Sequence, residues 1–140
     1  MAYPRTPYDR EGGLVYFPRM LDKMRLHLNG ELPEDYHDLR SNGFDGVCCQ
    51  FLQVDYADVL EQIKNGASDG EVLAWCFAQG RKPTEQDIDM FNGALSKRGW
   101  RDESSERLAE IVGRNGFSPE TQTWFDLIEA DEERTKSAAS

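Results

Sequence analysis

Four consecutive apolar segments between residues 55 and 116 each lie between a helix-capping residue and a glycine. They span residues 55–66, 68–80, 84–99 and 102–116, and in the last of these either Asp102 or Ser104 can be the cap. Within each segment the apolar residues recur at spacings of three and four, which is the period of one helix face. Because capping residues begin helices and glycines end them, the pattern predicts a series of short helices with brief connections.

The rest of the chain fits the same class. Pro18 suits the first turn of a helix that ends at Gly30, and residues 45–54 predict a short buried helix. The Ser-Pro pair at residues 118–119 predicts the start of a last helix, and the prolines and glycines of residues 3–13 predict an extended arm. No strand-like alternation competes with these assignments. We predict an all-α fold, a compact orthogonal bundle of about six or seven short helices with an extended N-terminal arm.

The length of 140 residues is in the range of one domain with one core. We therefore expect a single helical domain over residues 1–135. The small and polar residues 136–140 are expected to form a frayed C-terminal tail.

The net charge of −10 argues against general binding to nucleic acid or to anionic lipid, because both are repelled by an acidic protein. No segment approaches the roughly 20 apolar residues that span a bilayer. Residues 1–5 lack the hydrophobic stretch of a signal peptide, and three cysteines, two of them adjacent, suit reduced thiols. We expect a cytoplasmic protein with neither a membrane nor a nucleic acid as its partner.

A cluster of charged residues lies on the polar face of the helix that follows Pro18. Arg19, Asp22, Lys23 and Arg25 fall within two helical turns, and Asp22 lies three residues from each arginine. Two arginines held in place beside a lysine suit a phosphate or carboxylate ligand. The preferred alternative is a solvated face, or a buried network that ties the helix to its neighbours.

This cluster supports two main hypotheses about function. In the first, the chain is a non-catalytic binding or interaction domain whose Arg/Lys face takes an anionic metabolite or a protein partner. In the second, it is a small enzyme that holds an anionic substrate on the cluster while Tyr36, His37 or Asp22 transfers a proton. Tyr36 and His37 complete the candidate ligand-binding set. A structural subunit that forms a homodimer is a third possibility.

The cysteines and histidines lack the spacing of a metal site. The chain has no Cys-x-x-Cys or His-x-x-x-His pair, although Cys48, Cys49, Cys76, His27 and His37 are suitable ligand types. Buried thiols are the preferred interpretation of the cysteines, since no sequence signature accompanies a Cys–His nucleophile. We expect no metal and no cofactor, and we assign no catalytic residue.

Basic residues also gather at residues 97–101, where Trp100 precedes Arg101. A tryptophan among basic side chains can stack on a nucleic-acid base. The preferred interpretation is that Lys97 and Arg98 oppose the negative end of a helix dipole.

Several stretches in the first two thirds of the chain have the residues and the order of a known family. They are Gly13-Leu14-Val15, PRMLDKMR at residues 18–25, Tyr36-His37, Phe51-Leu52, Val54-Asp55, GASDGEVLAW at residues 66–75, and Asn92. Together they resemble the bacterial family known as domain of unknown function 5069. The resemblance implies a small helical protein in a bacterium. It implies no activity, so no functional residue is carried over from it.

Overall fold

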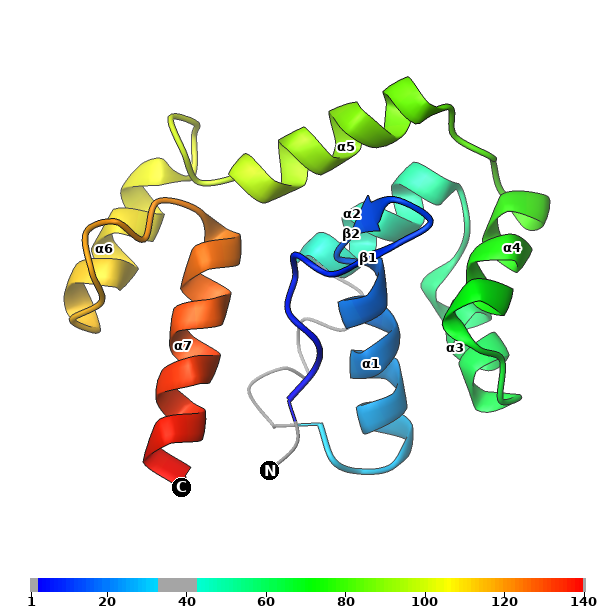
Figure 1. Cartoon of the computed structure of the whole chain (residues 1–140), viewed down its shortest axis with the longest axis horizontal. Coiled ribbons are helices and arrows are strands. Elements are labelled where there is room, and N and C mark those ends of the chain that lie inside the picture. Colours follow the sequence, from blue (N-terminus) through cyan, green and yellow to red (C-terminus); the bar gives the residue numbers. More distant parts are fainter. Residues whose placement is uncertain (1–2, 33–42, 140) are drawn as a thin grey trace. The chain divides into compact units, whose positions relative to one another are not determined.

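The computed structural model describes residues 3–32 and 43–139, with side chains as far as Glu133 (Figure 1). Contacts group the chain into two units, Met1–Phe91 and Asn92–Ser140, and each is described by itself. Of the helices in the described residues, none is both long enough and apolar enough to cross a membrane.

A short β-hairpin follows the N-terminal arm. Strands β1 (Arg10–Glu11) and β2 (Leu14–Val15) pair antiparallel, with Arg10 opposite Val15. Gly12 and Gly13 form the turn with φ of 58° and 86°, and a type I′ hairpin turn requires positive φ at both of its central positions. The prolines and glycines of this segment predict a turn but no strands, because two-residue strands are too short to show an alternating pattern.

Four helices build most of the first unit. They are α1 (Phe17–Leu28), α2 (Gly43–Leu52), α3 (Tyr56–Lys64) and α4 (Asp69–Gln79). α1 packs on α3, and α3 contacts both α2 and α4. The fully buried apolar side chains of this core include Phe17, Leu21, Met24, Leu52, Val59 and Val72.

Two capping boxes confirm the predicted starts of α4 and of α5 (Glu85–Lys97). The Ser68 side chain accepts a hydrogen bond from the Glu71 N–H, and the Glu71 carboxylate accepts one from the Ser68 N–H. Thr84 and Asp87 exchange the same two bonds, so aspartate serves where glutamate is more common.

The end of α4 lies directly against the end of α2 at Gly80. A Cβ atom on Gly80 would lie 1.9 Å from the carbonyl oxygen of Leu52 and 2.7 Å from that of Gln53. The next residue, Arg81, donates its backbone N–H to the same Leu52 oxygen at 3.0 Å. Only glycine leaves room for this approach of two backbones.

The second unit contains α6 (Ser105–Arg114) and α7 (Trp124–Ala139). Its core includes Leu95 from the end of α5, Leu108 and Val112 from α6, and Phe125 from α7. Gly99 lies at the turn after α5 with φ of 100°, and a Cβ atom there would lie 2.7 Å from the Leu108 side chain. The loop that follows α5 therefore passes close over α6.

The last helix begins later than the sequence predicts. Ser118 accepts a hydrogen bond from the Thr121 N–H, so residues 118–121 form a turn and the predicted start at residues 118–119 is wrong. α7 begins at Trp124, where the Thr123 hydroxyl accepts a hydrogen bond from the Asp126 N–H. The helix therefore begins at the Thr123 hydroxyl cap, which lies next to the apolar residues, and not at the proline.

The all-α prediction, with six or seven short helices after an N-terminal arm, is confirmed by seven helices in the described residues. The single domain over residues 1–135 stays a prediction, because contacts group the chain into two units. The frayed tail over residues 136–140 also stays a prediction. The α7 backbone is helical to Ala139, but the side chains beyond Glu133 lie outside the description.

Candidate functional site

Lys23, one member of the predicted anion-binding cluster, is buried in an ion pair. Its side chain is 4% exposed, and its Nζ lies 2.9 Å from Oδ2 of Asp45, which is fully buried on α2. The Tyr16 hydroxyl donates to the other carboxylate oxygen of Asp45 at 2.7 Å. Lys23 therefore joins α1 to α2 inside the first unit, where a soluble ligand has no access to it.

Burial shifts the titration of both partners toward their neutral forms. It raises the pKa of the Asp45 carboxyl and lowers the pKa of the Lys23 ammonium, although the attraction of each group for the other opposes the shift. Burial also raises the pKa of the Tyr16 hydroxyl well above its usual value. Asp45 contacts both of the other groups, so its loss would remove the charge and the acceptor that offset the burial of Lys23 and Tyr16.

Arg19 and Asp22 hold the backbone of the N-terminal arm. Arg19, only 4% exposed, donates from Nη1 to the carbonyl oxygen of Arg5 at 3.2 Å. The Asp22 carboxylate accepts a hydrogen bond from the backbone N–H of Arg5 at 3.1 Å. Two side chains of α1 thus bind both polar groups of one peptide residue in the arm.

Arg25 links α1 to the start of α4. It donates to Asp22 Oδ1 at 3.2 Å and makes a second ion pair with Asp69. Arg5 pairs with Asp69 at 3.4 Å and with Asp9 at 2.9 Å, so the arm, α1 and α4 share one ionic network. Arg25 is about one third exposed, and its guanidinium already contacts two carboxylates.

The structure brings Arg19, Asp22, Lys23 and Arg25 onto one helix, as predicted, but commits them to bonds within the protein. Tyr36 and His37 lie outside the described residues. Whether these six residues bind a ligand stays a prediction.

Asp22→Ala is expected to lower the free energy of unfolding by about 1–2 kcal/mol, because Asp22 is partly buried and accepts two charge-assisted or backbone hydrogen bonds. Urea unfolding measures the change. Asp22→Asn keeps one acceptor oxygen and should lose less. A loss of about 3–5 kcal/mol, typical of a fully buried ion pair, would contradict this geometry.

The three cysteines are buried free thiols. Burial raises the pKa of Cys49 and of Cys76 to about 12, and that of Cys48 well above its usual value. A thiol that stays protonated at neutral pH is a poor nucleophile and a poor metal ligand. Within residues 3–32 and 43–139, no three His, Cys, Asp or Glu side chains group closely enough to hold a metal ion.

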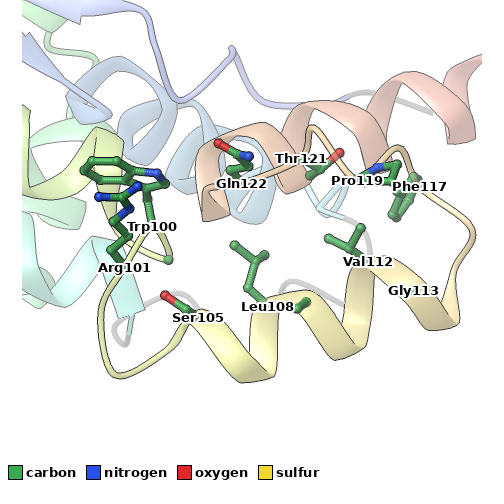
Figure 2. Close-up of a pocket in the computed structure, with 12 residues that line it drawn as sticks. Trp100, Arg101, Ser105, Leu108, Val112, Gly113, Phe117, Pro119, Thr121 and Gln122 are labelled. Atoms are coloured by element: carbon green, nitrogen blue, oxygen red, sulfur yellow. The ribbon is translucent and has the colours of Figure 1, made fainter.

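An open cleft of about 390 Å³ lies in the second unit (Figure 2). α6 forms one wall, residues 117–122 form the other, and Trp100 and Arg101 lie at one end. The lining residues are Gly99, Trp100, Arg101, Ser105, Leu108, Ala109, Val112, Gly113, Phe117, Pro119, Thr121 and Gln122. Arg101 is the one formally charged residue among them.

Backbone conformation presents Trp100 and Arg101 at the end of the cleft. Gly99 and Arg101 both have positive φ, at 100° and 53°, on either side of Trp100. The Arg101 guanidinium carbon lies 4.8 Å from the centre of the Trp100 ring, within the range of a cation–π contact. Trp100 remains 45% exposed, so this stacked pair is accessible.

A second cleft, of about 230 Å³, lies in the first unit. It is lined by Gln53, Val54, Asp55, Asp58, Trp75 and Gln79. Its lining is mostly polar, so it offers a ligand little apolar surface to bury.

The sequence indicated only one end of the cleft in the second unit. Trp100 and Arg101 stand out in the sequence as an aromatic–basic pair, whereas Phe117, Thr121 and Gln122 belong to no recognisable motif. The sequence feature that could have pointed to these residues is the helix end at residues 115–116, because the Ser-Pro turn that follows brings the chain back beside the helix.

Comparison with known proteins identifies a family but no activity. A family model described as domain of unknown function (DUF5069) matches residues 1–134, which include the first unit and most of the second. A search of curated proteins finds no match. The resemblance noted from the sequence is confirmed over a longer stretch than it covered, and the chain belongs to the DUF5069 family.

Proposed function

We propose that the chain is a non-catalytic binding module whose ligand site is the cleft of the second unit. One observation carries the proposal. The cleft has the size of a small-molecule site, and its lining includes no Asp, Glu, His, Cys, Lys or Tyr. Such a lining can bind a ligand but has no side chain that exchanges a proton near neutral pH.

Ser105 is the one lining side chain that merits a test as a nucleophile. Its hydroxyl accepts a hydrogen bond from the Asp102 N–H at 2.8 Å and lies 3.4 Å from Asp102 Oδ1. Hydrogen bonds, first of all from the Gly99 N–H, lower the pKa of Asp102 to about 2. A carboxylate this acidic is too weak a base to activate a serine. The pair is better explained as the cap of α6.

The ionic network of α1 supports a scaffold role better than an anion-binding role. Arg19 and Lys23 are buried, and their bonds are directed to Arg5 and Asp45. The more exposed part of the network holds three carboxylates, from Asp9, Asp22 and Asp69, against the guanidiniums of Arg5 and Arg25, so its balance of charge is negative and does not attract an anion. The alternative hypothesis, an enzyme that holds its substrate on this cluster, loses support for the same reason. We also propose a cytoplasmic location, from the acidic composition and the free thiols.

The proposal is tested by filling the cleft. Gly113 lines the cleft on α6, and a Cβ atom there meets nothing within 4 Å, so the backbone leaves room for a side chain and Gly113→Phe adds a ring to this wall. Small molecules from a fragment library that bind the wild-type protein by ligand-observed NMR should bind this variant at least about tenfold more weakly.

The matched control is Arg107→Phe, which places the same ring on an exposed α6 position outside the lining. Its ligand affinities should equal those of the wild type. Fragments that bind both variants as well as the wild type, or a library without a single binder, would contradict the proposal.

A further inference from the structure

We infer that the cleft of the second unit takes a small organic carboxylate with an aromatic body. The inference rests on the proposed function and adds the chemical class of the ligand. Three features carry it: the single cation at one end, the apolar surface along α6, and the hydroxyl and amide groups on the opposite wall.

Arg101 supplies the charge. Among the residues that the structure describes, it has no ion-pair partner, and its contact is the face of Trp100. Nearby Arg98, in contrast, is paired with Asp102 and Glu103 and does not line the cleft. One uncompensated cation in a protein of net charge −10 therefore marks the cleft as the place where an anion is attracted.

The geometry of Arg101 favours a carboxylate. A guanidinium presents two parallel N–H donors that match the two oxygens of a carboxylate. The positive φ of Arg101 sets the direction in which its side chain leaves the backbone, and stacking on Trp100 restricts the guanidinium before a ligand arrives, which reduces the entropy lost on binding.

A phosphate fits this end of the cleft less well. Phosphate sites commonly use the free N–H groups at the start of a helix. At the start of α6, the Asp102 carboxylate already accepts from the Ser104 N–H at 2.9 Å and from the Gly99 N–H at 2.7 Å. A dianion beside Asp102 would be repelled, whereas one carboxylate at Arg101 is matched by one positive charge.

The apolar surface favours an aromatic body. Leu108 and Val112 lie along the α6 wall, with Phe117 on the opposite side (Figure 2). Together with the exposed Trp100 ring, Phe117 allows offset or edge-to-face contacts that a flexible aliphatic chain does not make. Thr121 and Gln122 supply polar groups that can orient a ring substituent.

Three small molecules separate the contribution of the ligand's carboxylate to binding from that of its aromatic ring. Isothermal titration calorimetry of the full chain with 2-naphthoate, 2-naphthamide and acetate compares the ring with charge, the ring without charge, and the charge without the ring. We expect 2-naphthoate to bind at least about tenfold more tightly than 2-naphthamide, and acetate not to bind in the millimolar range.

Arg101→Gln should remove the preference by weakening 2-naphthoate to the affinity of 2-naphthamide, which itself should not change. Arg107→Gln, at an exposed α6 position outside the lining, should behave as the wild type. Arg101→Lys keeps the positive charge but lacks the two parallel N–H donors, and it should retain part of the preference for 2-naphthoate over 2-naphthamide. Circular dichroism of each variant verifies that the helices remain.

The outcomes distinguish the two proposals. Equal binding of 2-naphthoate and 2-naphthamide, with both lost in Gly113→Phe, overturns the carboxylate and keeps the binding module. A preference for 2-naphthoate that survives Arg101→Gln overturns the assignment of the charge to this cleft. If 2-naphthoate does not bind while other fragments bind in a Gly113-dependent way, the ligand class is wrong. If nothing binds in the cleft, both proposals fail.

Discussion

Asp45→Ala is expected to lower the free energy of unfolding by about 3–5 kcal/mol, the largest loss that we expect from a single polar substitution in this chain. The change removes the acceptor of both the Lys23 ammonium and the Tyr16 hydroxyl, and all three residues are buried. The Lys23 ammonium then loses the carboxylate whose charge offsets its burial. Urea unfolding followed by circular dichroism measures the loss.

The control replaces both members of the ion pair. Asp45→Leu combined with Lys23→Met fills the same space with apolar groups, and a buried ion pair exchanged in this way often costs little. The double variant should therefore be more stable than Asp45→Ala. Both variants also remove the acceptor of the Tyr16 hydroxyl, so equal losses would mean that the loss comes from packing or from that hydrogen bond and not from the charge of Lys23.

Gly80→Ala is expected to cost about 3 kcal/mol or more, at or above the upper end of the usual penalty for overpacking. The added Cβ atom would lie 1.9 Å from the Leu52 carbonyl oxygen. That oxygen belongs to the backbone and also accepts the Arg81 N–H, so it cannot move aside as a side chain does. The ends of α2 and α4 would have to separate.

Gly70→Ala is the matched control at the opposite end of α4. A Cβ atom on Gly70 meets nothing within 4 Å, and alanine in a helix is favoured over glycine by roughly 0.5–1 kcal/mol. Thermal unfolding should therefore show a small gain for Gly70→Ala and a large loss for Gly80→Ala. Similar effects at both positions would refute the close approach at Gly80.

The helix starts that the sequence predicted correctly depend on residues close together in the chain. Ser68 and Glu71, like Thr84 and Asp87, are three residues apart, so their capping bonds form within one turn of backbone. The Ser-Pro pair at residues 118–119 is an equally local signal, but it forms a turn and the Thr123 hydroxyl begins α7 instead. A short sequence motif therefore shows that an element begins or ends nearby, but it does not decide at which residue the helix starts.

The candidate sites depend on distant residues, and this limits their prediction. Lys23 and Asp45 are 22 residues apart, and only the packing of α1 against α2 determines that the lysine faces inward. A charged residue on an amphipathic helix is ordinarily on the solvent side, so the sequence left both a solvated face and a buried network open. The cleft is equally hard to predict, because its lining includes Trp100, which precedes α6 in the chain, and Gln122, which follows it.

The way in which α1 holds the arm has a consequence for how freely position 5 can vary. Arg19 and Asp22 bind the carbonyl oxygen and the N–H of Arg5, groups that every residue type except proline offers. Substitution at position 5 thus removes only the pairings of its exposed side chain with Asp9 and Asp69. The docking of the arm is insensitive to what residue 5 is and sensitive to what residues 19 and 22 are.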